Sequence, residues 1–363
     1  MSRHADHFDV AVVGAGPGGA VAAKTCAEAG LSTVLLERRA LPREKVCSGM
    51  LFGRRAQELV AEEFGSIPED LLLDTLRGVK LLVPGVGDAK IVAETPITWR
   101  RDLDFWMVGQ AVEQGARLWE STRVCDVSVN GHGCTVTALR GAEEVEVTSR
   151  FVIGADGPTS VTRSRVFPEI KLKYTTASRE CFRWQEGMER DHSVIVLPQG
   201  RYRPNFWINP KGDVFTVEGA LRELGSVVGG FLEGYGFVAQ EPLWRDGCAS
   251  RPLSLYERFA SDGFTAARGN VLLVGDAAAL KIPVSGEGIG TALSSGLSAA
   301  RSIIASIETG QRVDAIYRRE LGPLLDCLAR CHVAVDRLRV KEGTEFLTAL
   351  EEAFAESIID IEY

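Results

Sequence analysis

The beginning of the chain carries apolar runs in a strand–helix–strand order. Residues 8–13 (FDVAVV) are apolar and end at a glycine, which is typical of a buried parallel strand. An alanine-rich segment to about residue 29 has the composition of a helix, and residues 31–36 (LSTVLL) form a second apolar run. This order predicts a βαβ unit.

Farther along, β-rich stretches alternate with helical ones. Short alternating runs separated by Gly, Pro and Asp predict strands in residues 76–94 and 171–223. The other expected elements are a helix over 103–115, strands over 116–127, 145–153 and 270–274, a small-residue helix over 288–307, and a helical tail from 313.

The fold class that follows is α/β, with a Rossmann-like nucleotide-binding domain, an inserted mixed β-sheet substrate domain (the cap domain) and a C-terminal helical segment. The nucleotide-binding domain is expected to be discontinuous, because the β-rich stretches interrupt it. Its expected segments are 1–77, 95–165 and 255–305, those of the cap domain are 78–94 and 166–254, and the helical region is 306–363.

Charge and composition narrow the function classes. The formal net charge of -8 argues against nucleic acid as a partner, which would require a basic stripe. Residues 1–9 are polar, so no secretion signal is expected, and no apolar run approaches the length of about 18 residues of a membrane span. We expect a cytoplasmic protein, and contact with a membrane surface stays open. The eight cysteines are scattered without metal or iron–sulfur spacing, which indicates reduced thiols and no metal site.

The glycines after the first strand have the spacing of a phosphate-binding turn. Gly14, Gly16 and Gly19 form G-x-G-x-x-G between a strand and a helix. Such glycines allow a tight turn, a close approach of pyrophosphate to the backbone, and close packing of helix and strand. Glu37 ends the second strand, where a carboxylate can accept hydrogen bonds from ribose hydroxyls. The motif predicts a dinucleotide but does not distinguish FAD from NAD.

Two later segments resemble motifs of a known superfamily. Gly154-Ala155-Asp156-Gly157, followed by Ser160 and Arg163, resembles the "DG" motif of flavoprotein hydroxylases. Residues 271–278 (VLLVGDAA), with Pro283 and the GEGIG run over 286–290, resemble their "GD" motif. With the first motif, the chain is similar over residues 8–305 to the FAD superfamily with the para-hydroxybenzoate hydroxylase fold. The resemblance implies FAD as the cofactor.

Within that superfamily, the chain resembles the geranylgeranyl reductase (FixC-like) group. Residues 45–49 (KVCSG) resemble the group's K-x-C-G-G loop, Arg100 and Asp104 its R-x-x-x-D pattern, and residues 283–297 its P-x-x-G-E-G-I signature. The resemblance implies that Asp276 contacts the ribitol and that the turn over 285–290 faces the N1–C2=O edge of the flavin. The cofactor-binding residues implied by the turn and the resemblance are Gly14, Gly16, Pro17, Gly18, Gly19, Glu37, Arg38, Cys47, Ser48, Gly49, Arg100, Val124, Asp156, Gly275, Asp276, Pro283, Gly286, Gly288 and Ile289.

One stretch departs from the group's pattern. Lipid-binding members of the geranylgeranyl reductase group carry a motif resembling Y-x-W-x-F-P-K-G in the cap sheet. This chain has Asn205 and Asn209 at the two outer aromatic positions of that motif. An amide buried without a partner costs roughly 1–3 kcal/mol. Either these side chains point away from the cavity or the substrate has polar groups there. The aromatic candidates for substrate contact are Trp99, Trp184, Phe206 and Trp207.

The leading hypothesis for function is reduction of carbon–carbon double bonds, in an isoprenoid or another largely apolar small molecule, by hydride transfer from N5 of reduced flavin. Cys47 and Glu287 are candidate catalytic groups by position only. The alternatives are an FAD-dependent monooxygenase, hydroxylase or halogenase-like, and a flavoprotein that passes electrons to a quinone. The electron donor stays open between transient NAD(P)H and ferredoxin.

Overall fold

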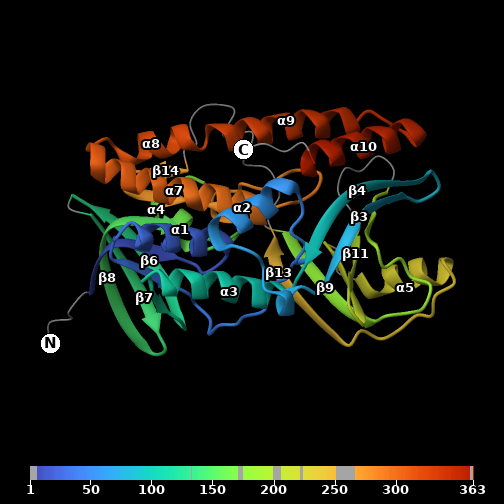
Figure 1. The fold of residues 1–363 in the computed structure, drawn as a ribbon, viewed down its shortest axis with the longest axis horizontal. Helices are drawn as coiled ribbons and strands as arrows, with labels where there is room; N and C mark the ends of the chain where they lie inside the picture. The colour runs from blue at the N-terminus through green and yellow to red at the C-terminus, as the bar shows by residue number, and fades with distance from the viewer. Residues whose placement is uncertain are drawn as a thin grey trace.

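The computed structural model describes residues 6–131, 133–170, 175–198, 206–220, 224–250, 266–359 and 363. Asn205 and the expected boundary at 254/255 between cap and nucleotide-binding segments lie outside these residues, as do parts of the strand-rich stretch 171–223. The described chain forms two sheets with helices packed against them (Figure 1). This architecture confirms the predicted α/β fold class.

The first sheet has the order β14-β15-β8-β1-β2-β5, with the β6–β7 hairpin continuing from β8. The pairs β1–β2, β1–β8, β8–β15 and β2–β5 are parallel. Its strands are β1 (Asp6–Val13), β2 (Thr33–Leu36), β5 (Arg117–Trp119), β6 (Thr122–Asn130), β7 (Gly133–Arg140), β8 (Glu143–Gly154), β14 (Ala267–Arg268) and β15 (Val271–Leu273). The strands predicted near 8–13, 31–36, 145–153 and 270–274 are thereby confirmed.

Helices from distant parts of the sequence pack beside this sheet. They are α1 (Pro17–Glu28), α2 (Arg54–Phe64), α3 (Arg100–Glu113), the short α4 (Val161–Val166) and the long α7 (Ile289–Thr309). The predicted helices over 103–115 and 288–307 correspond to α3 and α7. The sequence pattern did not predict α2, which packs four apolar side chains inward: Ala56, Leu59, Val60 and Phe64.

The second sheet has the order β13-β9-β12-β11-β10-β3-β4 and is antiparallel except for the β10–β3 pair. Its strands are β3 (Asp74–Val83), β4 (Gly87–Ile97), β9 (Thr175–Arg183), β10 (His192–Val196), β11 (Phe206–Lys211), β12 (Val214–Gly219) and β13 (Trp244–Ser250). The helix α5 (Leu224–Gly234) covers one face through an apolar cluster that includes Phe206, Phe215 and Val228. Chain segments from both sides of α3 therefore build this sheet.

The C-terminal helices join the two sheets. Figure 1 shows α8 (Val313–Glu320), α9 (Gly322–Leu338) and α10 (Gly343–Ile358) as one layer along the top of the view. At one end, the Tyr317 hydroxyl donates to the Leu273 carbonyl at 2.8 Å. At the other, Phe346, Leu350 and Phe354 of α10 share a buried cluster with strands β3 and β4. The helical tail predicted from residue 313 thus bridges both sheets.

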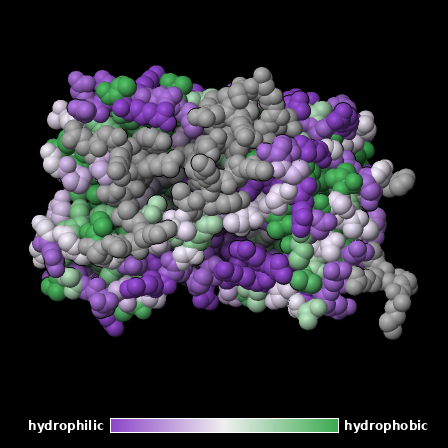
Figure 2. All heavy atoms as spheres, turned by 180° about the vertical axis from the view of Figure 1, so that it is seen from behind, coloured by the Kyte–Doolittle hydropathy of each residue, from purple (hydrophilic) through white to green (hydrophobic). Residues whose placement is uncertain are grey.

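The described helices include none that is long and apolar enough to cross a membrane. On the face shown in Figure 2, hydrophobic side chains are scattered among hydrophilic ones.

The helices α1 and α7 touch through their backbones. A Cβ added to Gly296 of α7 would lie 2.3 Å from the Gly18 carbonyl oxygen, and one added to Gly18 would lie 2.7 Å from that of Ala292. Real Cβ atoms do not approach backbone this closely. Both helices begin beside the pocket described below, so this contact sets the relative position of their N-termini.

We predict that Gly296→Ala lowers the free energy of unfolding by about 1–3 kcal/mol, because the methyl group must push two helix backbones apart. Gly109→Ala in α3 is the matched control, since a Cβ there meets nothing within 4 Å. It should stabilise the helix by about 0.4–1 kcal/mol. Urea unfolding of both variants measures the difference, and equal stabilities would contradict the predicted contact.

Candidate functional site

The turn after β1 leaves an open space at the start of α1. Gly14 has φ 101°, and a Cβ there would lie 2.5 Å from the Ala155 carbonyl oxygen, so glycine is required. A Cβ on Gly19 would lie 1.9 Å from the Gly14 carbonyl oxygen, which brings helix and strand together. At Gly16, in contrast, the nearest atom is an Arg43 nitrogen at 4.0 Å. The N-terminus of α1 therefore borders open space, which Gly16, Pro17 and Gly18 line.

Glu37 is held at the end of β2. Its Oε2 accepts from the Ala15 N–H at 3.1 Å and lies 3.2 Å from Nε of Arg43, and its Oε1 accepts from the Arg39 N–H at 3.1 Å. The side chain is buried but lines the pocket. A carboxylate has about four lone-pair sites, so these contacts leave capacity for ligand hydroxyls.

A buried charge network supports the same wall. Asp104 accepts two bonds from Arg100, at 2.7 and 3.0 Å, and one from Arg43 at 3.2 Å. Burial works to lower the pKa of Arg100, but Asp104 and Cys47 raise it above its ordinary value. Arg43 also donates to the Ala15 carbonyl at 3.0 Å, which ties it to the turn. The expectation from sequence included Arg100 and Asp104 but missed Arg43, for which the sequence offers no recognisable signal.

Two further strand ends reach the same space. After β8, Asp156 Oδ2 accepts from the N–H and the hydroxyl of Thr162, while its Oδ1 makes no hydrogen bond of regular geometry within the described part of the chain. Burial raises the pKa of Asp156, and bonds from Ser160 and Thr162 lower it. After β15, the 3₁₀ turn η2 (Gly275–Ala277) brings Gly275 and Asp276 beside them.

The start of α7 carries a buried carboxyl group. Oε1 of Glu287 accepts from the Gly290 N–H, and the buried Tyr363 side chain interacts with the same carboxyl group. Oε2 is buried and makes no hydrogen bond of regular geometry within the described residues. Burial raises the pKa of Glu287 to about 7, against the opposing effect of N–H groups at the helix start. Glu287 therefore keeps a proton to higher pH than a solvated carboxyl group.

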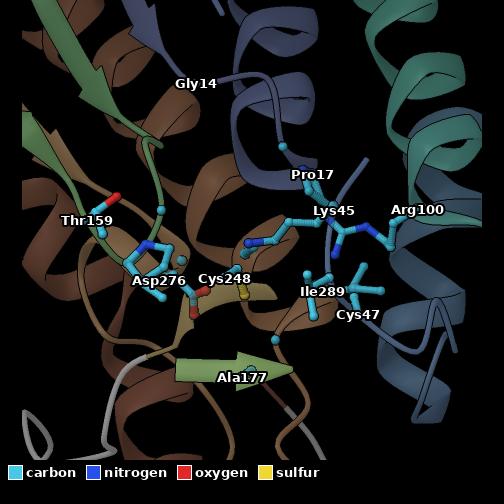
Figure 3. Close-up of a pocket in the computed structure, with 18 of the residues that line it drawn as sticks. Gly14, Pro17, Lys45, Cys47, Arg100, Thr159, Ala177, Cys248, Asp276 and Ile289 are labelled. Atoms are coloured by element: carbon cyan, nitrogen blue, oxygen red, sulfur yellow. The ribbon is translucent and has the colours of Figure 1, made fainter. Parts of the chain in front are cut away.

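These features surround one cavity of about 880 Å³. Figure 3 shows residues of several elements converging on it: Asp276 after β15, Ala177 and Cys248 from the second sheet, and Ile289 at the start of α7 near Lys45, Cys47 and Arg100. The candidates that line it are Gly14, Gly16, Pro17, Gly18, Glu37, Arg38, Cys47, Ser48, Arg100, Val124, Asp156, Gly275, Asp276, Gly286, Glu287, Gly288, Ile289 and Trp207. Residues not anticipated from sequence also line it, among them Arg43, Lys281, Glu218 and Asp246.

The other candidates lie outside the cavity lining. Gly19, Gly49 and Pro283 do not line it. A Cβ on Gly49 would lie 1.9 Å from the Thr98 carbonyl oxygen, so this glycine allows two backbone segments to meet. Trp99 packs against Trp244 with the Lys211 Nζ 4.1 Å from its ring centre. Trp184 packs edge-on to Phe215, and Phe206 is buried against Phe231 under α5. The structure therefore brings Trp207 alone of the four aromatic candidates to the cavity lining.

The donor set fits a flavin dinucleotide. The free space at Gly16 admits a pyrophosphate, and Glu37 can face a ribose. The N-terminus of α7 borders the same cavity, so its positive dipole end faces the space that a flavin ring would occupy. Among the described residues, no group of His, Cys, Asp and Glu could hold a metal ion.

Comparison with known proteins agrees with this fit. A family model described as an FAD binding domain matches residues 7–55 and 96–184. The chain is 30% identical over 370 residues to digeranylgeranylglycerophospholipid reductase 1 of Methanopyrus kandleri, covering 95% of each chain. It is 28% identical to geranylgeranyl diphosphate reductase of Rhodobacter capsulatus, over 85% of this chain and 78% of that protein. Its fold matches a geranylgeranyl bacteriochlorophyll reductase-like protein of Thermoplasma acidophilum, with TM-score 0.73, 21% identity and coverage of 97% and 96%.

We predict that Gly16→Val yields a folded protein without flavin. The backbone at Gly16 is extended, with φ -87°, and its Cβ position is open, so valine fits the fold but fills the space needed by the pyrophosphate. Gly14→Ala, in contrast, should lower the melting temperature, since it collides with Ala155 at a left-handed φ. Flavin absorbance per protein and thermal melting distinguish the two effects, and a fully flavin-loaded Gly16→Val protein would contradict this placement.

A second prediction concerns Glu287. The carboxyl group has an ordinary pKa of 4.5 when unfolded and about 7 when folded, so its contribution to stability is complete below pH 4.5 and is lost as pH rises through 7. Glutamine does not titrate. Glu287→Gln should therefore gain roughly 3 kcal/mol relative to the unmutated protein between pH 4.5 and 7. Urea unfolding of the flavin-free proteins at both pH values measures this, and a constant difference would rule out the raised pKa.

Proposed function

Because the chain belongs to the geranylgeranyl reductase family of FAD-dependent oxidoreductases, we propose that it reduces carbon–carbon double bonds of an isoprenoid or another largely apolar substrate. The names of the M. kandleri and R. capsulatus relatives describe reductases of isoprenoid compounds. The observation that carries the proposal is the cavity between the two sheets. Its wall at the first sheet has the features of a flavin-binding surface, and its wall at the second sheet could hold a second molecule.

The residues of the first sheet would bind and orient FAD. The N–H groups that begin α1 would hold the pyrophosphate, Glu37 a ribose, and Asp276 the ribitol. Arg100, fixed by Asp104, would keep positive charge near this path. When bound and reduced, FAD supplies a hydride from N5. The helix start at Gly288 to Ile289 would stabilise negative charge at the N1–C2=O edge of the ring.

An apolar wall in the cavity suits a hydrocarbon chain. Met50, Phe52, Trp207 and Val284 line it, and the Phe52 and Trp207 rings meet edge to face at 6.1 Å between centres. Burying such a chain against these side chains would contribute about 25 cal/mol per Å² of apolar surface removed from water. The same wall would exclude water from the reacting carbons.

Reduction of an alkene also needs a proton at the second carbon. Glu287 and Cys47 both line the cavity. The raised pKa of Glu287, about 7, leaves its carboxyl group partly protonated near neutral pH, beside the Tyr363 side chain. We propose that Glu287 holds a proton at the flavin edge of the cavity, with Cys47 as the alternative source.

We predict that geranylgeraniol reoxidises the dithionite-reduced holoprotein in the absence of oxygen, with loss of one double bond per flavin. The expected signal is return of the oxidised flavin absorbance, with the product identified by mass spectrometry. The fully saturated alcohol is the matched control and should leave the flavin reduced. Reoxidation that requires oxygen would instead indicate a monooxygenase, and reoxidation by a quinone alone would indicate electron transfer.

A further inference from the structure

The second sheet has two chemically different faces. Strand pairing aligns Trp207, Glu218, Arg179 and Asp246 side by side across β11, β12, β9 and β13, and we call this set the polar row. Alternate residues of a strand point to opposite faces. Residues on the opposite face of β11, β12 and β9 include Phe206, Val217, Phe215 and Phe182, which share a buried apolar cluster with α5.

A second line of residues beside the polar row is also polar. Asn209 pairs with Thr216 across β11 and β12. Each lies two residues along its strand from Trp207 or Glu218 and so on the same face, and both side chains are fully buried. The Ser193 hydroxyl donates to Oδ1 of Asn209, but Nδ2 of Asn209 and the Thr216 hydroxyl have no partner among the described residues. Oε1 of Glu218 also has none. Unpaired buried polar atoms are rare in proteins, and their concentration on one face calls for a functional reason.

Glu218 is the point at which this polar face meets the cavity. It lines the cavity together with Trp207 and Asp246 of the polar row. Arg179, its cross-strand neighbour, is already engaged: it donates to both carboxyl oxygens of Asp246, at 3.1 and 2.7 Å, and to the Cys47 carbonyl at 3.2 Å. Glu218 therefore interacts with Arg179 and Lys211 through charge, while its Oε1 is buried and without a partner among the described residues and its side chain lines the cavity.

Protonation adds a donor to this group. Burial raises the pKa of Glu218, while the charges of Arg179 and Lys211 lower it. Burial dominates, so the carboxyl group keeps a proton at higher pH than one in water. A protonated carboxyl group both donates and accepts a hydrogen bond. It can pair with a hydroxyl or with a carbonyl oxygen.

We propose that Glu218 is a polar subsite that binds a hydroxyl or carbonyl oxygen of the substrate, so that the substrate is an oxygenated isoprenoid whose polar group lies on the second sheet. This inference rests on the proposed function, because it specifies the substrate of the same cavity. A pure hydrocarbon placed against Glu218 would remove water from the carboxyl group and return no hydrogen bond. Asn209, at a position where the resembling motif has an aromatic residue, is fully buried, bonds to Ser193 and lies outside the cavity lining, so it does not contact the substrate space.

Binding of two matched ligands tests the proposal without turnover. The oxidised holoprotein is titrated with geranylgeraniol and with the hydrocarbon in which hydrogen replaces the hydroxyl group, in the same detergent, and the flavin absorbance change is followed. The ratio of the two Kd values, compared between variants, cancels the different solvation of the ligands. Glu218→Leu should shift this ratio toward the hydrocarbon by about tenfold or more, because one hydrogen bond to the alcohol is lost.

Two variants serve as controls. Glu218→Gln keeps a donor and an acceptor and should preserve most of the preference. Thr176→Val removes a hydroxyl elsewhere on the cavity lining and should leave the ratio unchanged. Flavin content and circular dichroism confirm that each variant folds.

The outcomes separate this inference from the proposed function. An unchanged ratio in Glu218→Leu, an equal shift in Thr176→Val, or no binding of the alcohol by the unmutated protein would overturn the subsite. If the alcohol binds with the expected dependence on Glu218 yet fails to reoxidise the reduced flavin, the subsite stands and the reductase reaction is rejected.

Discussion

The direct backbone contact between α1 and α7 is the constraint on which the site depends. Gly18 and Gly296 leave no room for side chains between the two helices, and Gly19 brings α1 equally close to the turn at Gly14. Each helix begins at the cavity, so the contact directs two positive helix ends toward one space. Larger residues would separate these ends and the ligand groups that they are suited to hold.

The carboxyl groups around the cavity are removed from water, so each must either pair with a cation or keep its proton more strongly. Asp104 is shared by Arg100 and Arg43, and Asp246 is bound by Arg179 through both oxygens. These carboxylates are paired and serve to position their partners. Glu287, in contrast, has an oxygen that makes no hydrogen bond of regular geometry within the described residues, and burial raises its pKa. The same physical cause, removal from water, thus makes some acids structural and leaves others able to hold a proton.

The two sheets contribute different kinds of structure to the cavity. The first contributes strand ends, helix starts and short loops to the cavity lining. The second contributes a sheet face, whose period of two places Trp207, Glu218, Arg179 and Asp246 in one line while apolar neighbours anchor α5. Arg179 also holds the Cys47 loop through its carbonyl, so the sheet face and the loop are positioned together.

The sequence by itself determined the class of fold and the tight turn at Gly14 to Gly19, because these depend on local patterns and glycine geometry, and its resemblance to known flavoproteins indicated FAD. It did not indicate α2, or that Arg43 supports Glu37, because those contacts join segments that only the packed chain brings together. The aromatic candidates show the same limit: Trp207 reaches the cavity, whereas Trp184 and Phe206 pack in the core. Strand register and pairing decide which face a side chain occupies, and a shift of one residue would reverse it.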